Sequence, residues 1–274
     1  MLNRGSKEPA VKQLQNQLLA IGYPLPKYGA DGDLGTETLG AVTRFLFDHE
    51  DGYADADPTS VSDEELAFIQ QVYDQVQRDN PLPGLNFFDL RRESDSRNIH
   101  GRRLWTDITG STLHQCAVDF GHEKPARWDT LSAHVGVSRE GNVFWVHEFE
   151  HIIWHGNELN HSQVGIEFEG LYAGILAQPN GRTEHPTPEQ VKAGLETIPW
   201  IMRTIAAHNG KMVNLNAHRQ TAQTRRGDPG EELWRLVALP TIAQFGLTDG
   251  GPAFKIDNGR VIPNEWNPDY PGIY

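Results

Sequence analysis

A histidine and an aspartate, His218 and Asp228, stand ten positions apart in one polar segment of the chain. The segment ends at Pro229–Gly230, which is ordinary turn chemistry. Zinc accepts both imidazole nitrogen and carboxylate oxygen, and a catalytic zinc ion takes three protein ligands and leaves one position open. The spacing therefore predicts two ligands of one metal ion. A chance histidine beside a turn gives the same pattern unless a third ligand and a base lie upstream.

Upstream of this segment lies a further histidine, His114. It stands at the end of a predicted strand in the segment DITGSTLHQCA. Cys116 follows two residues later and would lie on the same face if the strand continues. We interpret Cys116 as a small buried apolar residue.

Two glutamates, Glu167 and Glu169, lie on another predicted strand. In NHSQVGIEFEG, apolar residues alternate with polar ones from Val164 to Phe168, which predicts a strand with its apolar face toward the core. Glu167 and Glu169 would project from the other face, where a carboxylate held on a strand can take a proton from an attacking water. The same alternation also fits two glutamates on a solvated sheet face, so the pattern alone leaves both interpretations open.

A second zinc motif competes with this site. Residues 147–151 read HEFEH and match the HExxH signature of zincin metalloproteases. That mechanism needs a helix, which brings both histidines to one side of the metal. Here the motif follows a Gly141–Asn142 turn and the strand-like run VFWV, with no helix cap between them. We favour a histidine-rich strand end and keep the zinc protease as an alternative.

Three short helices are predicted ahead of these segments. Apolar residues recur at helical spacing over residues 8–22, and Gly22 stands where a helix end belongs. Thr36 is placed to cap a second helix, and Ser62 with Glu65 forms a capping box for a third. Residues 1–79 are therefore predicted to form a small all-α module.

The second part of the chain mixes strands and helices. A breaker cluster opens a predicted linker over residues 80–100, and residues 101–247 are predicted to form an α/β domain. Strand-like runs lie around residues 104–109, 133–138, 143–146 and 164–168. A capping box at Thr187–Gln190 opens a helix to about His208, which Pro199 should kink. Residues 248–274 form a tail whose function the sequence does not reveal.

The composition excludes several classes of protein. The net charge of −13 argues against nucleic-acid binding, which depends on Lys and Arg. No run approaches the ~18 apolar residues of a membrane span, and no signal peptide is evident, so we expect synthesis in the cytoplasm without membrane insertion. A single cysteine excludes an internal disulfide framework. An acidic protein would need a dedicated module to hold it on an anionic polymer.

The helical module resembles the peptidoglycan-binding type 1 domain over roughly residues 4–79. The likeness rests on an ordered set of helix and turn residues that includes Asp31, Gly32, Leu34, Gly35 and Thr38. It implies a module that binds the bacterial cell wall. A generic three-helix interaction domain is the alternative.

Residues 104–240 resemble the zinc-dependent N-acetylmuramoyl-L-alanine amidases of the amidase-2 class, whose fold the animal peptidoglycan recognition proteins share. The likeness rests on the order LHQ, SAHVGVSREGNVFWV, WHG, NHSQVGIEFEG and AHRQTAQTRRGDPG. It implies an α/β domain with a central mixed sheet flanked by helices. It also implies one Zn²⁺ per chain on His114, His218 and Asp228, with Glu167 as the general base.

The resemblance extends to the substrate side of the site. Trp154, His155 and Asn160 match positions that line the substrate groove, and His134, within a predicted strand, is a further core or groove candidate. Arg226 stands where the family often has a lysine that helps to stabilise the oxyanion. Arginine keeps the charge, but its planar fork is not interchangeable with an ammonium group.

These expectations combine into a modular, bacteriolytic and antimicrobial hydrolase. It would cut the amide bond between N-acetylmuramic acid and L-alanine of peptidoglycan, and we expect it to be a monomer. It would reach the wall after release by a host-lysis system or a secretion machine, with a phage endolysin as the favoured setting over an injected effector or a recycling amidase. A non-catalytic peptidoglycan receptor is the alternative of another class. Such receptors typically lack one of the metal ligands, whereas all three are present here.

Overall fold

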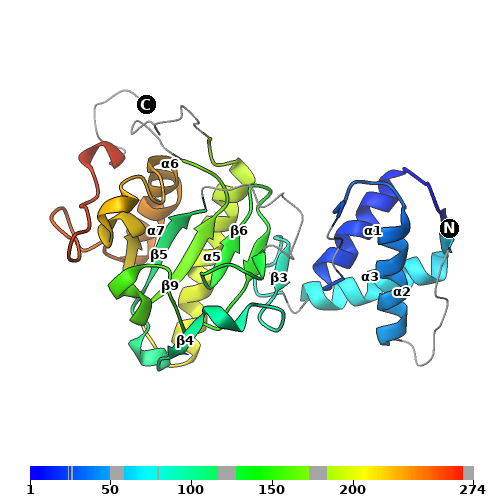
Figure 1. Ribbon diagram of the computed structural model, residues 1–274, viewed down its shortest axis with the longest axis horizontal. Coiled ribbons are helices and arrows are strands. Elements are labelled where there is room, and N and C mark those ends of the chain that lie inside the picture. The colour runs from blue at the N-terminus through cyan, green and yellow to red at the C-terminus, as the bar shows by residue number, and fades with distance from the viewer. Residues whose placement is uncertain are drawn as a thin grey trace. The chain divides into compact units, whose positions relative to one another are not determined.

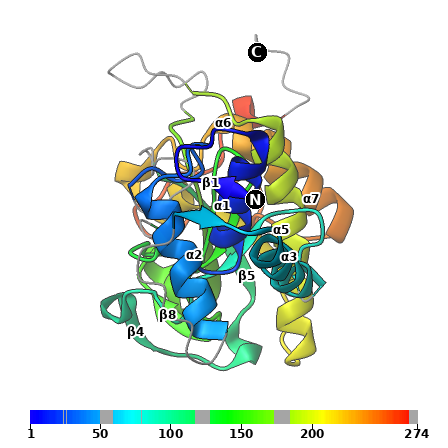
Figure 2. The same cartoon turned by 90° about the vertical axis from the view of Figure 1, so that its right-hand side faces the viewer.

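The computed structural model describes residues 1–23, 25, 27–49, 59–78, 80–116, 128–172 and 184–267, with no side chains for 76–78. These residues divide into two compact units between Asp89 and Leu90. The first unit contains three helices, α1 (Pro9–Ala20), α2 (Thr36–His49) and α3 (Asp63–Arg78), which Figure 2 shows side by side. It also contains the short strands β1 (Leu2–Asn3) and β2 (Ser60–Val61), which pair antiparallel, and β3 (Phe87–Asp89). The unit is thus mainly but not purely helical.

The helices of the first unit bury the apolar faces that the sequence predicts. Val11 and Leu18 of α1, Phe45 of α2 and Ile69 of α3 are fully enclosed. The predicted capping box of α3 is confirmed, since the Glu65 N–H donates to Ser62 Oγ (3.1 Å) and the Ser62 N–H donates to Glu65 Oε2 (2.6 Å).

One buried amide organises the turn between α1 and α2. Gln15 Nε2 donates to Asp31 Oδ1 (2.9 Å) and to Thr38 Oγ1 (2.9 Å), while Gln15 Oε1 accepts from the Gly32 N–H (2.7 Å). Leu34 has no exposed surface and Thr38 is 2% exposed. Leu34 and Thr38 therefore contribute to the packing of the module rather than to its surface.

The second unit is built on a mixed β-sheet. Five of its strands follow the order β10 (Asn214–Ala217), β5 (Gly110–Gln115), β9 (Gln163–Phe168), β6 (Val135–Val137) and β7 (Val143–Trp145). Neighbours from β10 to β6 run parallel, and β7 is antiparallel to β6. A separate antiparallel pair joins β4 (Ile99–Arg102) to β8 (His151–Ile153).

Helices cover this sheet, as the sequence predicts for an α/β domain. Helix α5 (Pro188–Ala207) lies across one face of the sheet in Figure 1. A Cβ at Gly194 would lie 2.9 Å from the ring of Phe168, so only a residue without a side chain lets α5 approach β9 this closely. Helix α6 (Glu231–Leu233), a π turn (Trp234–Ala238) and α7 (Leu239–Phe245) follow in one continuous run. None of the helices that the structure describes is long and apolar enough to cross a membrane.

Two predicted details of the second unit differ from the structure. Residues 104–109 are not a strand, because Asp107 accepts a hydrogen bond from the Leu104 N–H (3.2 Å) and closes a 3₁₀ turn before β5 begins at Gly110. Thr187 caps α5 as predicted, but the side-chain amide of Gln190 donates to carbonyl oxygens of the sheet instead of completing the capping box. Helix α5 continues through Pro199.

Candidate metal centre

Three adjacent parallel strands bring the candidate residues together at their carboxyl ends. His114 on β5 is paired in register with Glu167 on β9. Leu113 on β5 is paired with Ala217, the last residue of β10, so His218 leaves the sheet beside His114. In open sheets of this kind, ligands bind at the carboxyl ends of the strands. The topology therefore places the predicted site where binding sites of this architecture occur.

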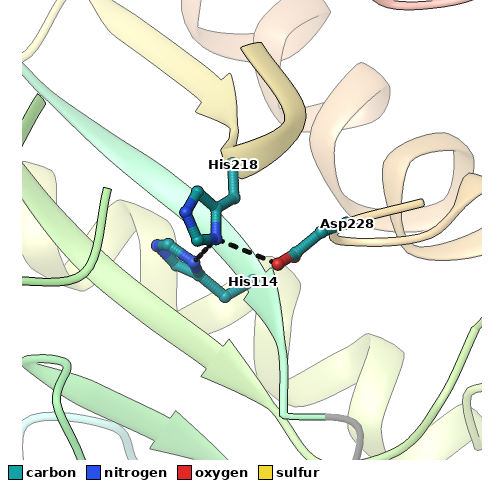
Figure 3. A group of neighbouring side chains, drawn as sticks. All are labelled: His114, His218 and Asp228. Atoms are coloured by element: carbon teal, nitrogen blue, oxygen red, sulfur yellow. Dashed lines mark hydrogen bonds and ion pairs between the residues drawn. The ribbon is translucent and has the colours of Figure 1, made fainter. Parts of the chain in front are cut away.

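The three predicted ligands converge on one point (Figure 3). The Nδ1 atoms of His114 and His218 lie 2.9 Å apart, and Asp228 Oδ2 lies 2.9 Å from His218 Nδ1. All three side chains are buried, at 1%, 8% and 5% exposed for His114, His218 and Asp228. Among the described residues, these three form a cluster of histidine and acidic side chains that could hold a metal ion.

Hydrogen bonds fix which nitrogen of His114 faces the other ligands. His155 Nε2 lies 3.2 Å from the Gln163 carbonyl oxygen, which only accepts, so this nitrogen carries the proton. Neutral His155 then offers a bare Nδ1, which lies 3.0 Å from His114 Nε2 and accepts its N–H. His114 Nδ1 is thereby left with a free lone pair directed at His218 and Asp228. Such an outer partner is typical of a metal-ligating histidine.

The donor set fits zinc. Burial, followed by the neighbouring histidines His218 and His155, holds the pKa of His114 well below its usual value, so its imidazole is neutral as a ligand must be. The Gln115 N–H donates to Asp228 Oδ1 (2.9 Å), which leaves Oδ2 turned toward the histidines. Two imidazole nitrogens and one carboxylate oxygen form the three-ligand set of a catalytic zinc site.

Glu167 lies beside this group. Its Oε1 is 3.9 Å from His114 Nδ1, and its side chain is 18% exposed. Burial raises the pKa of Glu167 to about 8, and the Asp228 carboxylate adds to the rise. Its Oε2 is buried without a hydrogen-bond partner among the described residues. Because Glu167 is largely buried and Glu169 has no exposed surface, neither glutamate lies on a solvated sheet face.

Cys116 differs from its interpretation as a buried apolar residue. It is only partly buried, and its thiol lies near Glu167. Desolvation, with the charge of Glu167, raises the pKa of this thiol well above its usual value. The thiol is therefore neutral beside the candidate base and does not compete as a ligand.

A cavity of about 510 Å³ opens onto the centre, and its lining includes Trp154, His155, Asn160, His218, Arg225 and Asn258. The predicted cationic residue, Arg226, is exposed and does not line this cavity. Arg225, which is also exposed, lines the cavity, and its charge acts on both His114 and Glu167. The two arginines adjoin, and the turn at Gln223–Arg225 brings Arg225 to the cavity wall, which no local sequence pattern indicates.

The remaining predicted groove residues have different surroundings. Trp154 is 64% exposed and stacks on the ring of His100, with ring centroids 3.7 Å apart. Asn160 lines the cavity but also holds the turn, because its Oδ1 accepts from the backbone N–H groups of His155 (2.8 Å) and Gly156 (2.6 Å). His134 is fully buried, and its Nδ1 accepts from the Gly165 N–H (3.0 Å). His134 is thus a core residue, not a groove residue.

The HEFEH motif does not form a zincin site. His147 lies after β7 and His151 begins β8, so the motif spans a turn and a strand instead of a helix. The Nε2 of His147 contacts the Leu131 carbonyl oxygen (3.1 Å), and the ring is 1% exposed. The protease alternative therefore lacks the geometry that its mechanism needs.

Comparisons with known proteins match part of the chain to one family. Residues 103–231 match the amidase-2 family model, described as N-acetylmuramoyl-L-alanine amidase. The matched segment contains all three candidate ligands and Glu167. The match covers 129 of the chain's 274 residues, so it is a likeness of this part of the chain.

Individual relatives cover the chain unevenly. The N-acetylmuramoyl-L-alanine amidase CwlL of Bacillus licheniformis is 50% identical over 42 residues, so the match spans 15% of this chain and only 12% of that relative. Among solved structures, the amidase LysC of Clostridium intestinale is 13% identical over 59% of this chain and 98% of its own, with a TM-score of 0.43. A Drosophila PGRP-LB variant in complex with tracheal cytotoxin is 18% identical over 59% of this chain and 96% of its own, with a TM-score of 0.40.

Proposed function

We propose that this protein is a zinc-dependent N-acetylmuramoyl-L-alanine amidase that degrades bacterial peptidoglycan. The observation that carries the proposal is the convergence of His114, His218 and Asp228 beside Glu167, where a cavity opens. A zinc ion held by these three ligands supplies a Lewis acid that polarises a carbonyl oxygen and acidifies water.

The side chains around the centre have roles that their contacts support. Glu167, with its raised pKa and its unpartnered Oε2, accepts a proton from the attacking water and passes it to the leaving amine. Water adds to the lactyl carbonyl of N-acetylmuramic acid, the C–N bond breaks, and the products are a lactyl carboxylate and the free amine of L-alanine. The cation of Arg225 is placed on the cavity side to stabilise the charge that develops on the carbonyl oxygen.

The outer part of the cavity suits a sugar. The exposed ring of Trp154, stacked on His100, gives a flat apolar surface beside the cavity. Such a surface packs against the apolar face of a pyranose ring, while the amides of Asn160 and Asn258 supply hydrogen bonds. We propose that N-acetylmuramic acid binds here, next to the scissile amide.

The helical unit is proposed to hold the enzyme on the wall. A groove of about 430 Å³ in this unit is lined by residues of α1 and α3, among them Gln13, Gln17, Gln70 and Tyr73. Amides and one aromatic ring are the side chains that recognise uncharged saccharides. A wall-binding unit joined to an amidase domain is the arrangement of a phage endolysin, which is the setting we propose, with the protein acting as a monomer.

Digestion of purified sacculi tests the amidase assignment. We expect new N-terminal L-alanine and no new reducing sugar ends, together with one equivalent of zinc by metal analysis. A Glu167→Ala variant should retain zinc and lose turnover. A protein that binds peptidoglycan but contains no zinc and releases no amine is the receptor of the alternative hypothesis.

A further inference from the structure

Two of the three candidate ligands lie on one loop, His218–Asp228, which we call the ligand loop. Its regular structure consists of two 3₁₀ turns, His218–Gln220 and Gln223–Arg225. The Arg219 N–H donates to the Asp228 carbonyl oxygen (3.0 Å), which joins the two ends of the loop to each other. The position of the loop as a whole therefore depends on what packs against it.

Residues Asp249–Trp266, which we call the C-terminal segment, follow α7 and pack against the ligand loop. The Ile256 N–H donates to the Gln220 carbonyl oxygen (2.8 Å), and the Arg260 N–H donates to the Arg219 carbonyl oxygen (2.8 Å). In return, Gln220 Nε2 donates to the Asp249 carbonyl oxygen (2.9 Å). The two residues that directly follow the ligand His218 are thus held by the segment through backbone groups.

The side chain of Arg219 joins the two parts a second time. Its Nε donates to the Val261 carbonyl oxygen (3.0 Å), and its Nη1 donates to the carbonyl oxygen of Arg226 in the loop. Its guanidinium carbon lies 4.7 Å from the centre of the Trp266 ring, which is 1% exposed. A planar guanidinium can bond two carbonyl groups while it stacks on a ring, and an ammonium group cannot.

Gly259 shows how closely the segment approaches the loop. A Cβ at this position would lie 2.0 Å from the Gln220 carbonyl oxygen and 2.8 Å from the Thr221 nitrogen. Both atoms belong to the backbone, so no side-chain rotation relieves the overlap. A methyl group at Gly259 must push the segment and the ligand loop apart.

We propose that the C-terminal segment positions the ligand loop, with Arg219 as the positioning residue that fixes His218 and Asp228 relative to His114. The segment carries no ligand, and it acts through the backbone that follows His218. The inference rests on the proposed function only in naming zinc as the ion bound. The same segment contributes Asn258 to the cavity, so the element that holds the ligands also forms part of the substrate wall.

Gly259→Ala tests this proposal in the full-length protein. Chelator competition on the zinc-free protein should show at least tenfold weaker zinc binding, and kcat on sacculi should fall. Lys255→Ala is the matched control, because this exposed side chain of the same segment bonds to Asp257 in its own segment. The control should keep both the zinc affinity and kcat within twofold of the wild type.

Arg219→Lys is the second variant and decides the question if Gly259→Ala does not fold by circular dichroism. Lysine keeps the positive charge but lacks the planar guanidinium that bonds two carbonyl groups and stacks on Trp266. Zinc binding should therefore weaken by about tenfold. A lower melting temperature with unchanged zinc affinity, measured well below that temperature, would mean a merely structural contact and overturns the inference. A wild type that binds no zinc and releases no L-alanine overturns the proposed function instead.

Discussion

Replacing His155 with leucine tests how the candidate metal centre is oriented. In the structure His155 Nδ1 lies 3.0 Å from His114 Nε2, and both rings are buried. Without this acceptor, the proton of the zinc-free protein moves to His114 Nδ1, the atom that zinc must occupy. Zinc binding at Nδ1 returns this proton to His114 Nε2. In the variant the buried Nε2–H then has no acceptor, which costs about 1–3 kcal/mol. Because ~1.4 kcal/mol is tenfold in an equilibrium constant, zinc affinity should fall about 5- to 150-fold.

The assay is competition between the zinc-free protein and a chelator of known affinity. His155→Asn is the matched variant, because its amide oxygen stands near the position of Nδ1 and can accept the same hydrogen bond; it should recover most of the affinity. Trp154→Ala changes the exposed neighbour and should leave zinc binding unchanged. If His155→Leu binds zinc within twofold of the wild type, the tautomer argument is wrong.

The other predictions concern turnover and wall binding. Glu167→Gln should lower kcat about 10²- to 10⁴-fold with zinc content unchanged, measured as L-alanine amine release. Arg225→Ala should lower kcat about 10²- to 10³-fold and Arg226→Ala much less, so equal losses would contradict the placement of Arg225 in the cavity. Tyr73→Ala should weaken sedimentation with sacculi and leave cleavage of a soluble muropeptide unchanged; a loss of both would count against separate roles for the two units.

The sequence could indicate the candidate ligands and the candidate base because they lie in patterned segments and match one family's residues as a set. The alternation from Val164 to Phe168 predicted the strand and face of Glu167, and the register of β5 with β9 then sets it beside His114. The position of His218 after a strand is likewise a local property. What the sequence could not supply was the distance between segments 50 to 100 residues apart, which only the parallel pairing of β10, β5 and β9 creates.

Other features depend on contacts that no local pattern encodes. Which of two adjacent arginines lines the cavity depends on the rotation of a 3₁₀ turn, so the sequence pattern does not distinguish Arg225 from Arg226. The role of His155 depends on a carbonyl oxygen eight residues away that fixes its proton. Gln190 was read as half of a capping box, but its amide bonds to the sheet that α5 covers.

The hydrogen bonds of Gln15 bear on how helical units of this kind are recognised from their sequences. Its single amide binds Asp31, Gly32 and Thr38, and Leu34 beside them is enclosed. Asp31, Gly32, Leu34 and Thr38 belong to the sequence motif of such units. These residues therefore define the interior of the unit. Exposed side chains of its groove, such as Gln13, have no part in that interior. On the proposed function, two units with the same motif can differ in the wall chemistry they prefer, and exchanging exposed groove residues between them should exchange bacterial targets.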